Sequence, residues 1–234
     1  MRLKSQTVGQ AGLGLLFVLL LVSSAGATYV TPIGDSGETT VDEILTNYYS
    51  TWERIYDGPV PGDQWWYETD GVAFAEAKFA GDVSQFGYAQ GLSGGSPGNW
   101  ISVEGSGFGA HFVDVPDGPE VTLTIQGDPF FRMYVYDNTT GKTFSSLESE
   151  NSNDPYRSDH MVTYKILTDS KGFDSSGNYV VFWEDRINGD YDYNDLAVEM
   201  YKVAPVPEPT TVALFGLLLA GAALTNIARA RRRR

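Results

Sequence analysis

The sequence predicts an all-β exported domain, and three observations support this prediction. Apolar and polar residues alternate with a period of two over much of the stretch after residue 70, as they do in half-buried strands. The 234 residues include 26 Gly and 11 Pro, which is typical of short strands joined by many turns. No helical pattern alternates with these strands. Together the observations favour a β-sandwich or jelly roll over an α/β fold.

One short helix is expected before the strands. Thr40 and Glu43 match the two ends of a capping box, in which Thr40 is the N-cap and Glu43 occupies the third helical position. Apolar residues follow at helical spacing, so we expect a helix over 41–50. The period-two pattern predicts strands in seven segments, which are 72–79, 85–89, 121–125, 131–136, 161–167, 179–184 and 196–203.

Residues 1–27 have the three parts of a secretory signal peptide. A positive start precedes an apolar run over 13–22, which is too short to span a bilayer comfortably. Ala25 and Ala27 then form the small-x-small pattern of a signal peptidase site, which predicts cleavage before Thr28. The alternative is an uncleaved membrane anchor.

Residues 205–234 contain a second signal with three parts. Pro207, Glu208 and Pro209 precede 19 uncharged residues, 210–228, which is close to the length of a transmembrane helix. Five of the last six residues are Arg, and the positive-inside rule keeps such a cluster cytoplasmic. Residues 28–204 are therefore expected on the outer side of the membrane. The alternative is an ordinary single-pass anchor behind a proline-rich spacer.

This order of short motif, apolar helix and Arg cluster resembles the PEP-CTERM sorting signal of bacterial envelope proteins. The resemblance implies that exosortase, an integral-membrane cysteine protease, recognises and processes the tail near Pro207. It also implies a link to exopolysaccharide or biofilm matrix. The implied route is export through the inner membrane, single-pass anchoring by the C-terminal helix, and then a place in the cell envelope or outside the cell.

The stretch between the two signals, 28–204, is expected to be one domain. Seven of the 16 basic residues and one of the 30 acidic residues lie outside it, which leaves it a net charge of −20. This charge excludes a nucleic-acid partner, whose phosphates need a basic surface. It also favours the uptake of divalent cations. The chain has no Cys, which excludes a disulfide framework and a thiolate nucleophile.

The densest chemical signal is an acidic segment over 184–195. In an extended conformation, three oxygen-bearing side chains of this segment would face one side and two tyrosines the other. Carboxylates this close repel one another unless a proton, a hydrogen bond or a cation compensates them, and an oxygen-rich set without His or Cys favours Ca²⁺. The alternative is a series of Asx turns that cap backbone N–H groups. The candidate calcium ligands are Asp185, Asp190, Asp192, Asn194 and Asp195.

The same segment resembles a second pattern. A hydrophobic strand, an acidic pair, Gly-Asp-x-Asp-Tyr-Asn-Asp and another strand are similar to an uncharacterised domain of secreted bacterial proteins. This resemblance covers roughly residues 40–203 and implies an all-β extracellular module without an assigned activity.

We therefore expect a non-enzymatic protein of the cell envelope or extracellular matrix, sorted by its C-terminal signal and stabilised by calcium. The alternative is a module that binds or cleaves carbohydrate through its aromatic and acidic surface. Residues 65–67 (Trp-Trp-Tyr) are the aromatic candidates, although neighbours along a strand face opposite ways and core packing is their other role. No nucleophile turn supports a hydrolytic triad around the two His residues.

Overall fold

The computed structural model describes residues 32, 39–55, 64–79, 83–91, 98–108, 110–112, 120–123, 129–151, 159–169, 175–187 and 189–206. The expected signal peptide, with Ala25 and Ala27, and the sorting signal from Pro207 onward lie outside these residues. In the described ranges no helix has both the length and the apolar character needed to cross a bilayer.

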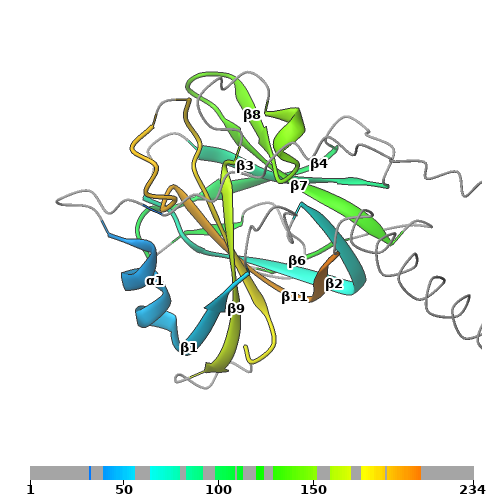
Figure 1. The fold of residues 1–234 in the computed structure, drawn as a ribbon. Coiled ribbons are helices and arrows are strands. Elements are labelled where there is room, and N and C mark those ends of the chain that lie inside the picture. The colour runs from blue at the N-terminus through cyan, green and yellow to red at the C-terminus, as the bar shows by residue number, and fades with distance from the viewer. Residues whose placement is uncertain are drawn as a thin grey trace, which may run out of the picture.

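The described part of the chain is mostly β-strand with one short α-helix, as the sequence predicts (Figure 1). Its elements in chain order are α1 (Val41–Tyr48), β1 (Tyr49–Arg54), β2 (Trp65–Ala77), β3 (Val83–Gln90), β4 (Gly98–Glu104), β5 (His111–Phe112), β6 (Glu120–Thr122), β7 (Phe130–Asp137), β8 (Lys142–Ser145), the 3₁₀ helix η1 (Glu148–Glu150), β9 (Met161–Asp169), β10 (Tyr179–Trp183) and β11 (Leu196–Val206).

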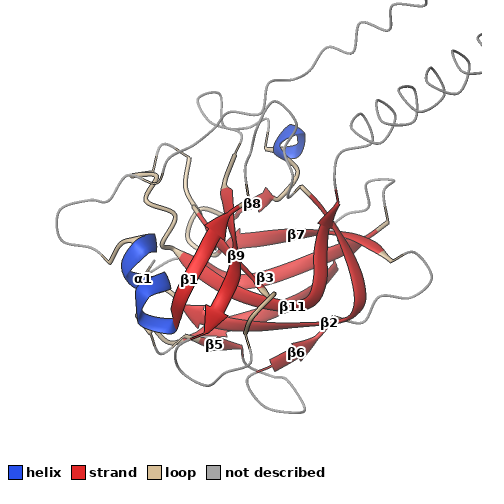
Figure 2. Cartoon of the chain, turned by 60° about the horizontal axis from the view of Figure 1, so that its bottom comes forward, coloured by secondary structure: helices blue, strands red, loops and turns tan. Residues whose placement is uncertain are grey.

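The strands form a single antiparallel sheet in the order β1-β9-β10-β11-β2-β7-β3-β4-β5, with β6 also paired to β2 and β8 to β7. The sheet is strongly twisted, so that β9 crosses the direction of β2, β7 and β3 in two views (Figures 1 and 2). Such a twist brings the two halves of one sheet face to face around a core.

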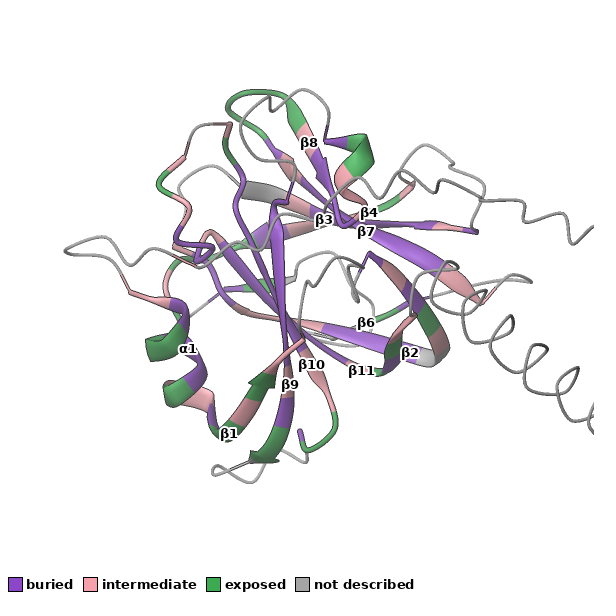
Figure 3. Ribbon diagram, viewed as in Figure 1, coloured by how far each residue is buried: buried purple, intermediate pink, exposed green. Residues whose placement is uncertain are grey.

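Two apolar cores lie on opposite faces of the central strands, and β10 contributes to both. Val181 and Trp183 enter the first core, together with residues from β2, β3, β7 and β11. Val180 and Phe182 enter the second core, beneath α1. Because successive residues of a strand face opposite ways, a strand buried on both faces is apolar throughout, as Tyr-Val-Val-Phe-Trp is. Figure 3 shows this burial along β9 and β10.

The helix α1 covers the second core and begins at the expected capping box. The Thr40 hydroxyl accepts a hydrogen bond from the Glu43 N–H (3.2 Å), and the Glu43 carboxylate accepts one from the Thr40 N–H (2.8 Å). The helix ends at Tyr48, two residues earlier than expected, because the backbone becomes extended at Tyr49 and pairs with β9. Four strands were not expected from the sequence: β1, β4, β5 and β8.

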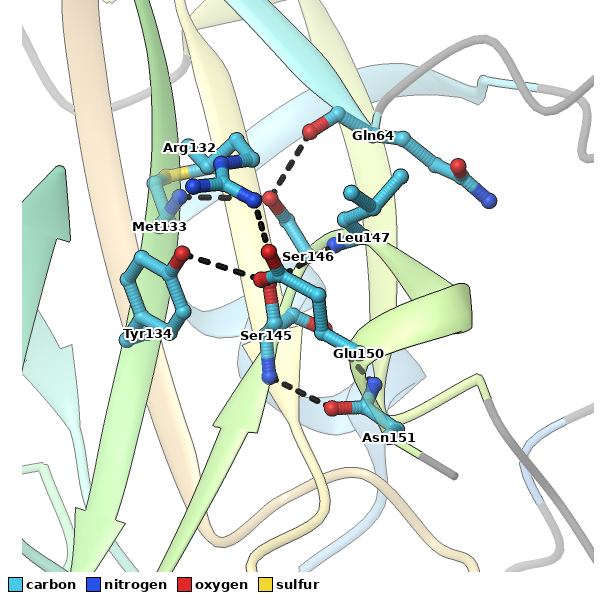
Figure 4. A network of polar contacts seen from close by, with 9 residues as sticks. All are labelled: Gln64, Arg132, Met133, Tyr134, Ser145, Ser146, Leu147, Glu150 and Asn151. Carbon is cyan, nitrogen blue, oxygen red and sulfur yellow. Dashed lines mark hydrogen bonds and ion pairs between the residues drawn. The ribbon is translucent and has the colours of Figure 1, made fainter. Parts of the chain in front are cut away.

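A polar network fastens η1 to the β7–β8 hairpin (Figure 4). The fully buried Arg132 forms an ion pair with Glu150, whose other oxygen accepts hydrogen bonds from the Tyr134 hydroxyl (2.9 Å) and the Ser145 hydroxyl (2.8 Å). The Asn151 side chain exchanges two hydrogen bonds with the Ser145 backbone. These contacts compensate the desolvation of a buried guanidinium.

A pair of carboxyl groups, one buried and one partly buried, joins β2 to β11 under the end of α1. The side chains of Glu76 and Glu199 are hydrogen-bonded to each other, and burial followed by the charge of Glu199 raises the pKa of Glu76 to about 8. Glu199 also accepts hydrogen bonds from the Tyr49 hydroxyl (2.7 Å) and from the Asn178 amide (2.6 Å). Glu76 is therefore protonated in the folded state at neutral pH.

This proton makes the stability of the fold depend on pH. The folded state keeps the Glu76 proton up to a pH of about 8, whereas the unfolded chain releases it near pH 4.5, so its contribution to stability is lost as the pH rises between these values. Glu76→Gln retains an N–H donor for Glu199 without a proton to lose. We expect the melting temperature of Glu76→Gln, relative to the parent, to increase from pH 5 to about pH 8 and to level off above it. A difference that does not change with pH would contradict the shared proton.

Candidate metal centre

The acidic segment follows β10 directly, and the fold buries its first two side chains. Glu184 and Asp185 continue the strand that is covered on both faces, and both are almost inaccessible to solvent. The Glu184 backbone is held by His160, whose C=O accepts from the Glu184 N–H and whose Nδ1 lies 2.9 Å from the Glu184 C=O. The carboxylates are thus positioned in the interior by backbone contacts.

The segment 189–194 is not extended, which corrects the sequence-based expectation. Tyr191 and Tyr193 both have left-handed backbone conformations, with φ of 61° and 59°. This conformation costs about 1 kcal/mol or more for each residue that is not Gly. Tyr193 is retained in it because its ring is fully buried in the second core and its hydroxyl donates to the Asp159 C=O (2.8 Å). The coiled segment does not present its acids on one face.

The carboxylates instead gather in two groups that share Glu184. Among the described residues, one group contains Glu184, Asp185 and Asp195, and the other contains Glu184, Asp190 and Asp192. In each group one oxygen from every member lies within 4.8 Å of the others, close enough to contact a single cation. Four of the five predicted ligands belong to these groups. Glu184, which the sequence analysis did not include among its ligands, belongs to both.

Asp185 is the distinctive member because, among the described residues, its carboxyl group is hydrogen-bonded only with another acid, Asp195. Its side chain is 0% exposed, and within the described part of the chain neither oxygen accepts a hydrogen bond from an amide, a hydroxyl or a basic group. The guanidinium of the exposed Arg186 lies 3.9 Å from Oδ1, beyond hydrogen-bond distance. A buried carboxylate normally accepts several hydrogen bonds, so its two oxygens are available to a ligand.

The carboxyl groups of Glu184, Asp185 and Asp195 repel one another when they are ionised, and added positive charge would offset this repulsion. Burial and the neighbouring carboxylates, chiefly Asp195, raise the pKa of Glu184 to about 9 and that of Asp185 to about 8. Burial also raises the pKa of Asp195. Lys78 lowers the pKa of Asp185, but burial in turn lowers the pKa of Lys78 itself. The group therefore requires protons or a cation when it is folded at neutral pH.

The Asx-turn alternative applies to a different part of the segment. Asp192 accepts hydrogen bonds from the backbone N–H (3.2 Å) and the side-chain amide of Asn194, as in an Asx turn. The Asn194 amide also donates to the Thr39 C=O (2.7 Å), next to the N-cap of α1. Both interpretations of the segment therefore apply, each to different residues. Asp192 and Asn194 shape the turn, while the carboxyl groups of Glu184, Asp185 and Asp195 lie close together.

Glu184 and Asp195 are each held through one carboxylate oxygen by a backbone N–H group. Oε2 of Glu184 accepts from the Tyr191 N–H, and Oδ2 of Asp195 accepts from the Asp185 N–H, both at 2.8 Å. Oε1 of Glu184 lies against the backbone of Gly189, where an added Cβ would overlap it. The group thus offers carboxylate oxygens that are fixed in place, which are the ligands that Ca²⁺ prefers. We conclude that these residues fit a hard cation.

The tryptophan pair identified in the sequence is divided between two faces, as the strand period predicts. Trp66 is fully buried in the first core, whereas Trp65 and Tyr67 lie on the opposite face of β2. Of the two His residues, His160 is buried and its ring stacks on the Phe144 ring, with ring centroids 4.0 Å apart.

Comparison with protein-family models gives no match, and a search of curated proteins gives none either. The arguments below therefore rest on the sequence and the geometry of the chain.

The close approach of Gly189 gives a direct test of how Glu184 is held. In Gly189→Ala the new methyl group must displace the Glu184 carboxylate, because it would overlap Oε1 and Cδ. We expect a loss of roughly 1–3 kcal/mol in the free energy of unfolding, typical of overpacking, measured by urea denaturation. Gly98→Ala is the control, because a Cβ there meets nothing within 4 Å. Equal stability of the two variants would contradict the described packing.

Proposed function

We propose that this chain is a non-enzymatic, exported module of the cell envelope or extracellular matrix whose folded state is stabilised by Ca²⁺. The observation that supports it most strongly is Asp185, a fully buried carboxyl group that, among the described residues, has no amide, hydroxyl or basic hydrogen-bond donor and lies beside Glu184 and Asp195. A cation bound there would contact carboxylates from all three residues. Its positive charge would offset the repulsion between these carboxylates. Without a cation, bound protons offset the same repulsion.

Calcium is favoured over other cations by the chemistry of the ligands and by the proposed location. The group has only oxygen ligands, which excludes metals that prefer thiolate or imidazole. Mg²⁺ demands a tighter octahedral geometry and gives up its water reluctantly. Extracellular calcium sites function with dissociation constants of about 10⁻⁴–10⁻³ M, so a modest site suffices outside the cell.

The sorting signal supports the location. Residues 205–234 contain the Pro207-Glu208-Pro209 motif, the uncharged segment and the Arg cluster. In this proposal the C-terminal helix anchors the chain in the inner membrane until an exosortase-type protease processes it, and exopolysaccharide is a partner of the released form. The described sheet, with its halves facing each other around a core, then serves as a sandwich-like or jelly-roll-like exported module.

Thermal unfolding tests the calcium proposal. A ligand that binds only the folded state stabilises it by about 2.7 kcal/mol at 100 times its dissociation constant, which corresponds to a rise of roughly 5–11 °C in melting temperature. We expect this rise in Ca²⁺ relative to chelator, and a smaller one in Mg²⁺. Asp185→Asn should remove most of the rise. It should leave the melting temperature in chelator at pH 7 nearly unchanged, because Asp185, whose pKa is raised to about 8, is already neutral there and Asn is a neutral side chain of the same shape.

Asp42→Asn is the matched control for this experiment. Asp42 is an exposed acid in the first turn of α1, so its variant should retain the full response to Ca²⁺. A parent protein that melts at the same temperature in Ca²⁺ and in chelator would contradict the proposal. A response that Asp185→Asn and Asp42→Asn diminish equally would show nonspecific binding to the acidic surface.

The sorting proposal has its own test in cells. Replacing Pro207-Glu208-Pro209 with alanines should leave an anchored, unprocessed chain. Replacing the five C-terminal Arg residues with neutral ones should instead weaken retention in the membrane, because these charges fix the orientation. Fractionation and mass spectrometry of the C-terminus distinguish the two outcomes. Identical maturation of the parent and both variants would refute the sorting signal.

A further inference from the structure

The end of the sheet that leads to residue 207 has an uncharged aromatic outer face. Residues opposite each other on antiparallel strands share a face. Tyr67 of β2 therefore lies in a row with Ala204 of β11 and Phe130 of β7. The rings of Tyr67 and Phe130 meet edge to face, with centroids 5.8 Å apart. Figure 1 shows β11 ending beside β2.

A second row extends the same face by two residues. Trp65 lies opposite Val206, the last residue of β11, and the buried Arg132 stacks on the Trp65 ring at 4.9 Å. The guanidinium of Arg132 is buried, and it is paired with Glu150, which is exposed beside this face. We call the outermost residues, which are Trp65, Tyr67, Phe130, Ala204 and Val206, the exit face. Tyr67 is 40% exposed.

The length of chain after Val206 limits what can lie near the exit face. The uncharged segment of the sorting signal begins at Thr210, only four residue steps later. Four steps span at most about 14 Å, and the headgroup layer on one side of a bilayer takes up roughly 5–8 Å of this. A compact domain of this size is roughly 40 Å across. So short a connection keeps the end of β11, and the exit face beside it, close to the membrane.

We infer that the exit face rests on the outer surface of the bilayer while the C-terminal segment spans it. This inference rests on the proposed anchoring and adds an orientation to it. Trp and Tyr are the residues that favour the membrane–water interface, where their rings meet the headgroups. The five residues of the exit face are uncharged, and the nearby charge of Glu150 is paired with Arg132. This matters because the stretch 28–204 carries a net charge of −20, which anionic lipid would repel elsewhere on its surface.

Fluorescent labelling of the full chain in vesicles tests this orientation. The chain has no Cys, so a single introduced Cys carries the only label. Tyr67→Cys and Ala204→Cys place a polarity-sensitive fluorophore on the exit face. Phe108→Cys is the matched control, because Phe108 is 45% exposed and lies beside α1, against Tyr48 and Phe79. Neutral phosphatidylcholine vesicles avoid charge repulsion.

We expect blue-shifted emission at positions 67 and 204, and at least threefold stronger quenching there than at 108 by quenchers attached to lipid headgroups. A chain that does not float with the vesicles would overturn the anchoring and this inference together. A chain that floats but is quenched equally at 67, 204 and 108 would overturn the orientation alone. Quenching at 67 and 204 by a quencher-labelled second copy, and not by lipid, would assign the exit face to self-association instead.

Discussion

The burial of β10 on both faces is the constraint on which the rest of this structure depends. Val181 and Trp183 fill one core while Val180 and Phe182 fill the other. The twisted sheet closes over the first core, and α1 closes over the second. Loss of either cover would expose one face of β10. The site is a consequence of the same burial, because Glu184 and Asp185 follow Trp183 without a break and are carried into the interior.

This placement joins the acidic group to the attachment of α1. Tyr193 packs in the second core with Ile44 and Leu45, and the Asn194 amide donates to the Thr39 C=O beside the N-cap. The helix α1 therefore packs in part against the segment that carries the carboxylates. A cation that offsets the repulsion between Glu184, Asp185 and Asp195 would also favour the docking of α1, because both depend on the same coiled backbone.

The sequence predicts the parts of this fold that depend on local patterns and misses those that depend on tertiary contacts. The capping box at Thr40 and the apolar strand β10 are visible because spacing alone identifies them. The strands β1 and β8 are short and rich in polar residues, so only their neighbours in the sheet reveal them. At the site, four of the five acids were predicted, but Glu184 and the grouping of the carboxylates were not. The left-handed conformations of Tyr191 and Tyr193, which no local pattern indicates, decide which carboxylates meet.

The central claim is that Glu184, Asp185 and Asp195 hold a calcium ion, and terbium luminescence tests it most directly. Tb³⁺ prefers the same oxygen ligands as Ca²⁺, and Trp183 and Tyr191 lie close enough in the chain to transfer excitation energy to it. The account predicts sensitised Tb³⁺ emission from the folded chain that excess Ca²⁺ displaces and that Asp185→Asn lacks. Emission that is absent from the parent, or equally strong in Asp185→Asn, would contradict it.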